Sequence, residues 1–222
     1  MPSVAEQPRP ADGDRRCAGE PPRAQAAILS AAEALLQERP LHELSVGDII
    51  AAAGISRTSF YAYFNSKTAV IAAGLRRVMD QVTVAVAPIH SQTAGYPESA
   101  IRISLQRWVD VSKRHGALLR AVSEEWPHDE ALRDLWFAML ESMAAGTAKV
   151  IDGARRAGEA PPGAPARALA ACLMWGYERV LHVALVGDAP GLPGPDAIVE
   201  PLTQMMVGGL YGRPFAGRPP AA

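Results

Sequence analysis

A group of polar and amphipathic side chains between residues 45 and 67 has the types and spacing for hydrogen bonding to DNA. Thr58 and Ser59 fall in the first turn of an expected short helix, where hydroxyls can reach the edges of bases. Tyr63 and Lys67 follow at positions better placed for phosphate oxygens. An expected helix start at Ser45 adds free N–H groups that can also face a phosphate. The candidate DNA-binding residues are Ser45, Arg57, Thr58, Ser59, Tyr61, Tyr63 and Lys67.

The distribution of charge permits such a surface, although the net charge of the chain is only −1. The segment from Gly54 to Arg77 contains four cations and no acidic residue, which gives it a formal charge of +4. Phosphate contact requires a local basic face, and an average over the whole chain can hide one. A solvated surface would explain the same cations, so this pattern alone leaves both interpretations open.

Residue patterns for catalysis or metal binding are missing from the sequence. It contains no GxSxG, no HExxH and no phosphate-binding glycine loop, and its five histidines are scattered. Glu178 and His182 have the i,i+4 spacing that can hold a metal, but no third ligand accompanies them. We therefore predict that the protein is not an enzyme and that it has no cofactor and no metal site.

Helical periodicity predicts the elements that must position the polar group. Ser45 and Ser56 are good N-caps, because a serine hydroxyl accepts a hydrogen bond from a free N–H in the first turn. Gly54 suits the left-handed conformation that often ends a helix, and Pro40 cannot continue one. The expected helices run from Pro22 to before Pro40, from Ser45 to Ala53, from Ser56 to about Phe64 and from Lys67 to about Ala87.

The rest of the chain is also helical in pattern, with glycine and proline clusters at the breaks. Strand-like alternation is nearly absent, and no internal repeat is found. The sequence therefore predicts an all-α fold of about nine helices. The later helices are expected near Pro97–His115, Ala117–Trp126, Asp129–Ala157, Ala164–Val186 and Pro195–Leu210.

Two short helices joined by a glycine turn form a layout that lets the second helix enter the major groove of DNA. Ile49, Ile55 and Phe60 can supply the small core between them. Ordinary short helices in a bundle would have the same pattern, with Tyr61, Tyr63 and Phe64 as core aromatics. The spacing alone leaves these two interpretations open.

The residue string from Ser45 to Lys67 resembles the DNA-binding segment of the TetR family of regulators. The resemblance is dense over residues 23–75, and Thr58 departs from it because many members have glycine there. It implies a symmetric dimer whose recognition helices enter successive major grooves of a near-palindromic operator. It also implies a repressor that a small ligand releases, although some members activate. The matching positions are Ser45, Ile49, Ala53, Gly54, Ile55, Ser56, Phe60, Tyr61, Tyr63, Phe64 and Lys67.

The chain from about Pro88 on contains all four tryptophans and five of the seven methionines. Such side chains can line an apolar ligand pocket or form an ordinary core, and composition alone favours the core. Cys172 lies in an apolar helical run, so we expect a small buried residue rather than a redox group. Glu178 interrupts the same apolar helix, where a buried carboxylate needs a partner. Arg179 or a ligand could supply it.

Residues 136–158 and 172–187 resemble the EthR-like regulators of ethionamide activation, a subgroup with a long, narrow, mainly apolar pocket. Met143 and Met206 stand where that pattern has tryptophans, and Met174 and Tyr177 stand where it has asparagines. Gly146 replaces an aromatic residue, so the resemblance implies an apolar effector but not the same one. The implied ligand-binding residues are Ile101, Trp108, Trp136, Leu140, Met143, Gly146, Thr147, Val150, Met174, Tyr177, Glu178, Leu181 and Met206.

The expected organisation follows from these patterns and from the resemblance. Residues 1–21 and 213–222 are expected to be disordered tails, because they lack apolar periodicity. Residues 22–68 should form the helix-turn-helix domain, and residues 69–212 should bind the ligand and form a homodimer through the last two helices. No apolar run suggests a membrane span or a secretory signal, so we expect a cytoplasmic protein.

Overall fold

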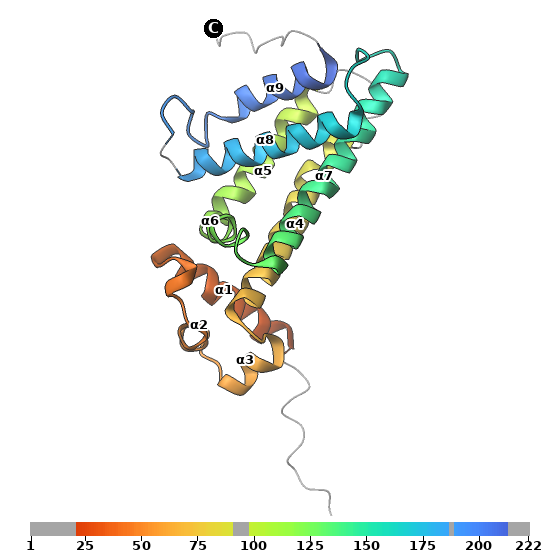
Figure 1. The fold of residues 1–222 in the computed structure, drawn as a ribbon. Coiled ribbons are helices and arrows are strands. Elements are labelled where there is room, and N and C mark those ends of the chain that lie inside the picture. The colour runs from red at the N-terminus through yellow and green to blue at the C-terminus, as the bar shows by residue number, and fades with distance from the viewer. Residues whose placement is uncertain (1–20, 91–97, 187–188, 213–222) are drawn as a thin grey trace, which may run out of the picture.

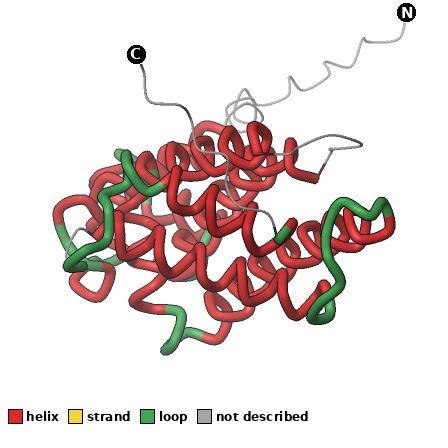
Figure 2. Tube along the Cα trace, turned by 90° about the horizontal axis from the view of Figure 1, so that it is seen from above, coloured by secondary structure: helices red, strands yellow, loops and turns green. Residues whose placement is uncertain are grey.

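The computed structural model describes residues 21–90, 98–186 and 189–212, and these residues form nine α-helices, one short 3₁₀ helix and no strand (Figures 1 and 2). The predicted all-α class is therefore confirmed. The tails expected at residues 1–21 and 213–222 lie outside the described residues, except for Pro21. The elements are α1 (Pro21–Glu38), η1 (Leu41–Glu43), α2 (Val46–Ala53), α3 (Arg57–Tyr63), α4 (Lys67–His90), α5 (Glu98–Arg114), α6 (Gly116–Glu125), α7 (Glu130–Arg156), α8 (Ala166–Val186) and α9 (Val199–Tyr211).

The first three helices and the start of α4 enclose a small core at the lower end of the molecule in Figure 1. Ser45 caps α2, and Ser56 caps α3 by accepting a hydrogen bond from the Ser59 N–H at 3.0 Å. Gly54 ends α2 with φ of +63°, the left-handed conformation that glycine adopts without steric cost. The core residues are Ile28, Ala32, Ile49, Phe60, Phe64 and Val70.

A larger core joins α4 to α9 and reaches down to the end of α1. The long helix α4 runs from the first three helices into this upper part, where α5 and α7 pack against it (Figure 1). Helices α8 and α9 cross the top of the molecule, and α8 packs mainly on α7 whereas α9 packs mainly on α5. The chain thus places a short helix pair at one end and a helical bundle at the other.

Three details differ from the sequence-based expectations. Helix α4 continues through Pro88 to His90 because Ile89 is buried in the main core and stabilises the last turn. The 3₁₀ helix η1 was not predicted. Cys172 is exposed on α8, so the expectation of a buried cysteine is wrong.

Candidate DNA-binding and effector sites

Helix α3 is fixed by one buried residue and presents the rest of its surface to solvent. Phe60 is 0% exposed and contacts the rings of Tyr61 and Phe64. The side chains of Arg57, Thr58, Tyr61 and Tyr63 are exposed on this helix, as a DNA-contacting face requires. The alternative, in which Tyr61, Tyr63 and Phe64 are core aromatics, is therefore wrong for the two tyrosines, whereas Phe64 is buried in the core.

Two neighbouring contacts order the start of this face. The Arg57 guanidinium lies 5.5 Å from the centre of the Tyr61 ring, and its Nη2 donates to the Tyr61 hydroxyl at 3.4 Å. The Ser56 hydroxyl donates to the Ser59 hydroxyl at 3.0 Å, so the Ser59 oxygen is already used within the helix cap. Thr58 is therefore the most accessible hydroxyl in the first turn of α3.

Ser45 is the N-cap of α2 and is hydrogen-bonded within that cap. Its N–H and hydroxyl both donate to the Asp48 carboxylate, at 2.8 and 2.7 Å, and its oxygen accepts from the Asp48 N–H at 3.2 Å. These hydrogen bonds from Ser45 hold the pKa of Asp48 below its usual value. The start of α2 thus carries its own negative charge, which opposes the phosphate contact that we expected there.

Lys67 points toward the backbone of the loop between α1 and α2. Its ammonium group donates to the carbonyl oxygens of Leu41 and Leu44, both at 2.8 Å, and lies 3.4 Å from that of His42. These carbonyls belong to η1 and the residue after it, which the sequence did not predict. The ammonium therefore ties the start of α4 to the loop between α1 and α2.

These contacts predict that Lys67→Met lowers the free energy of unfolding by about 2 kcal/mol, because carbonyl groups lose their donor. Arg76→Met, at an exposed cation on the same helix, is the control, and its effect should stay within about 0.5 kcal/mol. Urea unfolding measures both values. If Lys67 instead bound phosphate, its loss would reduce the salt slope of operator binding by about 0.9 and leave stability unchanged.

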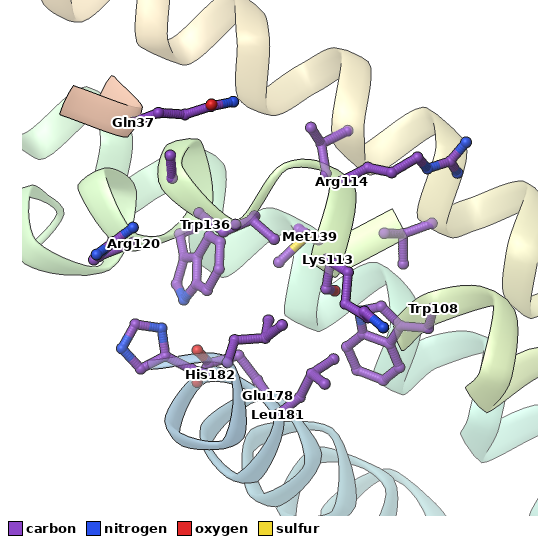
Figure 3. A pocket seen from close by; sticks show the side chains of 17 residues that line it. Gln37, Trp108, Lys113, Arg114, Arg120, Trp136, Met139, Glu178, Leu181 and His182 are labelled. Carbon is purple, nitrogen blue, oxygen red and sulfur yellow. The ribbon is translucent and has the colours of Figure 1, made fainter. Parts of the chain in front are cut away.

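The upper bundle contains a cavity of about 470 Å³ (Figure 3). It lies between α4, α5, α6, α7 and α8, and Gln37 at the end of α1 also lines it. Its volume is in the range of small-molecule sites. The lining residues are Gln37, Val78, Val82, Trp108, Ser112, Lys113, Arg114, Gly116, Ala117, Leu119, Arg120, Trp136, Met139, Glu178, Leu181, His182 and Leu185.

The structure brings together four of the predicted ligand-binding residues in this cavity, namely Trp108, Trp136, Glu178 and Leu181. The other nine do not line it, and most are buried in the surrounding core, where Thr147 contacts the Met174 sulfur at 3.9 Å. These nine are Ile101, Leu140, Met143, Gly146, Thr147, Val150, Met174, Tyr177 and Met206.

Sequence reasoning missed the contributions of α1, α4 and α6 to the cavity. On α8 a signal was available, because residues 178, 181, 182 and 185 lie at i, i+3, i+4 and i+7 and share one face. Val78 and Val82 on α4 have the same spacing, which also fits an ordinary core helix. Gln37 gave no signal, because only the tertiary fold brings the end of α1 to this site.

One end of the cavity is polar. The Glu178 side chain is 5% exposed, its Oε2 has no hydrogen-bond partner, and the half-exposed Arg179 lies 3.8 Å from it. Burial raises the pKa of Glu178, against the opposing effect of Arg179. Burial and the nearby Arg179 and Arg120 lower the pKa of His182. This end therefore disfavours charge on Glu178 and on His182 alike.

The raised pKa of Glu178 predicts a pH-dependent stability difference. The folded state holds this proton more tightly than the unfolded state, so ionised Glu178 destabilises the fold at neutral pH. Glu178→Gln should raise the free energy of unfolding by about 1 kcal/mol at neutral pH. The gain should shrink as the pH is lowered and vanish below the ordinary glutamate pKa of 4.5. Urea unfolding at several pH values tests this, with Glu124→Gln at an exposed position of α6 as control. A gain that is constant with pH would contradict it.

The wall of the cavity touches the helices at the lower end of the molecule in Figure 1. His115, between two lining residues, contacts the Glu33 carboxylate of α1 through Nδ1 at 2.5 Å and the Gln81 amide of α4 through Nε2 at 3.3 Å. Leu118 of α6 packs against Gly74 of α4, where an added Cβ would lie 3.1 Å from a Leu118 methyl carbon. Helix α6 is therefore in contact with α1, with α4 and with the cavity.

Comparisons with known proteins agree with this arrangement. The family model for bacterial regulatory proteins of the tetR family matches residues 28–73, and the model for the C-terminal domain of the transcriptional regulator EthR matches residues 100–212. The chain therefore belongs to the TetR family of DNA-binding transcriptional regulators. Within that family it carries the EthR C-terminal domain, so the resemblance stated from the sequence is confirmed.

Curated relatives match nearly the whole chain. The HTH-type transcriptional regulator EthR of Mycobacterium tuberculosis H37Rv is 33% identical over 213 residues, which are 96% of this chain and 94% of that protein. EthR of Mycolicibacterium smegmatis is 30% identical over 95% of this chain and 96% of its own length.

Solved structures share the fold at lower sequence identity. A putative TetR-family regulator from Syntrophomonas wolfei superposes with a TM-score of 0.69 at 14% identity, covering 83% of this chain and 93% of that one. SmeT, the repressor of a Stenotrophomonas maltophilia multidrug efflux pump, has a TM-score of 0.66 at 22% identity, with coverage of 83% and 88%.

Proposed function

We propose that the protein is a homodimeric repressor that binds a near-palindromic operator and is released from it by an apolar small-molecule effector. The observation that carries this proposal is the cavity, whose α6 wall contacts both helices that hold the DNA-binding end, α1 and α4. In this proposal residues 22–68 bind DNA, and residues 69–212 bind the effector and form the dimer. Because it acts on DNA, we also place the protein in the cytoplasm.

The proposed dimer forms through α8 and α9. In the single chain, Trp175 is 39% exposed on α8 and Met205 is 50% exposed on α9, which leaves large apolar side chains in contact with water. Gly208 and Gly209 are exposed beside Met205 and permit close approach of a second helix. Two copies related by a twofold axis would bury these faces against each other as a four-helix bundle.

On DNA, we propose that α3 lies in the major groove and that its exposed residues divide into two groups. Thr58, and Ser59 to a smaller extent, read base edges, whereas Arg57, Tyr61 and Tyr63 bind phosphates. The contacts of Ser45 and Lys67 lead us to assign them positioning roles for α2 and α4 rather than direct phosphate contacts.

Effector binding would act by displacing α6 relative to α1 and α4. A ligand can change DNA affinity only by binding the two conformations differently. A molecule that fills the cavity pushes on residues 114, 116 and 117, which flank His115. Movement of His115 would alter its contacts with Glu33 and Gln81, and α3 would move with them. The proposed result is a wider separation of the two recognition helices in the dimer.

We propose a binding role for the cavity rather than a catalytic one. Its lining residues include no cysteine and only one carboxylate, that of Glu178. Within the part of the chain that the structure describes, no three metal-ligating side chains come together. Across the same residues, no helix combines the length and the apolar character needed to span a bilayer.

Footprinting tests the proposed DNA-binding function. The full-length protein is used to select duplexes from a random pool, and the selected sequence is then probed by protection from cleavage. We expect a twofold-symmetric protected site with half-sites about one helical turn apart or at a multiple of that spacing. Binding that is sensitive to salt but independent of sequence would contradict the proposal.

A further inference from the structure

Two buried polar groups at the same end of the cavity have no hydrogen-bond partner in the protein. They are Nε1 of Trp136 on α7 and Oε2 of Glu178 on α8. The two side chains are only 4% and 5% exposed. Figure 3 shows the Trp136 indole nitrogen on the side of the cavity where the Glu178 carboxylate and the His182 ring lie. Leaving such groups unpaired costs about 1–3 kcal/mol each, so a ligand that pairs with them gains affinity.

The chemistry of these two groups restricts the ligand. An indole N–H can only donate, so the ligand must present an acceptor to Trp136. The unpartnered Oε2 of Glu178 accepts a hydrogen bond both when the group is ionised and when its proton is on Oε1, so a donor on the ligand would pair with it. A head group that carries an acceptor and a donor side by side meets both requirements, and a primary amide is the simplest one.

The charges around this end oppose a charged head group. A cation would meet Arg120, which lines the cavity, and Arg179, which lies 3.8 Å from Glu178. An anion would be attracted by Arg120, but it would lie against the carboxyl group of Glu178, the only acidic side chain of the lining, and a carboxylate has no donor for Oε2. An uncharged amide avoids both repulsions. The rest of the lining offers apolar surface to a chain, including Val78, Val82 and Leu181.

We propose that the effector is an apolar molecule with an uncharged amide head group, which accepts a hydrogen bond from Trp136 Nε1 and donates one to Glu178. This inference rests on the proposed effector role of the cavity. It assigns Trp136 and Glu178 as the residues that determine specificity for the head group, while the apolar wall sets the length and width of the chain that fits.

The test compares decanamide, decanoate, decylamine and decan-1-ol as ligands of the full-length dimer, measured by calorimetry without DNA. Decanamide should bind about tenfold more tightly than decanoate and decylamine, with decan-1-ol between them. Trp136→Phe keeps an aromatic ring, although a smaller one, but removes the N–H, and should weaken decanamide about tenfold while leaving decylamine unchanged. Glu178→Leu should act in the same direction. Met139→Leu, an apolar change in the lining, is the control and should shift all four probes together.

Several results would overturn the proposal. Tightest binding of decylamine, lost in Glu178→Gln, would make Glu178 the counter-ion of a cation. Tightest binding of decanoate would place an anion at this end. Equal binding of the four probes, or no binding of any, would mean that the two unpaired groups do not select a ligand. These rankings come from the wild-type protein, so they hold even if a variant does not fold.

A separate titration of operator binding in the presence of decanamide distinguishes this inference from the proposed function. If decanamide binds with the expected ranking but leaves operator affinity unchanged, the proposed effector role is wrong and the head-group assignment stands. If another apolar compound releases the operator while decanamide does not bind, the proposed function stands and the head-group assignment is wrong.

Discussion

Thr58→Glu should abolish specific operator binding, with a loss of affinity of about 100-fold or more at physiological salt. Thr58 is exposed in the first turn of α3, the position closest to base edges when the helix enters the groove. A carboxylate there would face phosphates and the acceptor edges of bases without a counter-charge. A glutamate near a helix N-terminus is favourable for the fold, so the loss would not arise from unfolding. Fluorescence anisotropy with a labelled operator measures it.

Ser142→Glu provides the matched control for this experiment. Ser142 is exposed on α7, in the upper bundle, so the variant adds the same charge far from α3. Its operator affinity should change less than threefold. A similar loss in both variants would show that net charge rather than the α3 surface controls binding, and full affinity in Thr58→Glu would remove this residue from the interface.

Gly74→Val should weaken operator binding about tenfold in the absence of any effector. The glycine lets α4 and α6 pack closely, because an added Cβ would lie 3.1 and 3.4 Å from the two methyl carbons of Leu118. Leu118 is buried, so it can yield little, and overpacking of this kind typically costs about 1–3 kcal/mol. The valine should therefore push α6 away from α4, which is the displacement proposed for a bound effector.

Gly153→Val separates this effect from a general cost of valine in a helix. A Cβ at Gly153 on α7 would meet no heavy atom within 4 Å. Operator affinity should stay within twofold of the wild-type value, and anisotropy measures both variants. If Gly74→Val bound the operator normally while remaining folded, the contact between α4 and α6 would not transmit the effector signal.

The helices and the exposed face of α3 were largely predictable because they depend on local signals. Ser45, Gly54 and Ser56 mark helix ends through hydrogen bonds and backbone conformation within a few residues. The direction of the Lys67 side chain was not predictable, because the carbonyls that it binds lie more than 20 residues away and belong to a 3₁₀ helix without a strong sequence pattern. The partners of the Lys67 ammonium group are therefore set by tertiary packing.

The cavity was predictable only in part for a related reason. Trp136 and Glu178 stood out as large or polar residues within apolar helices, and both line it. Met174 and Met206 have the same apolar character but face the packed core, and composition cannot distinguish the two environments. Cys172 lies on the face of α8 away from the core, where a second copy of the chain could cover it. The packing within one chain gives no information about a contact of this kind.

The distance between the two α3 helices of a dimer tests the central claim most directly. Spin labels at Ala62→Cys, an exposed position on α3, report it by pulsed electron resonance once Cys17 and Cys172 are replaced by serine. With operator bound, we predict a separation near one turn of DNA, about 34 Å or a multiple of it. In Gly74→Val without DNA, the separation should be longer than in the wild-type dimer. Identical distances in the two proteins, or no dimer distance at all, would contradict the account.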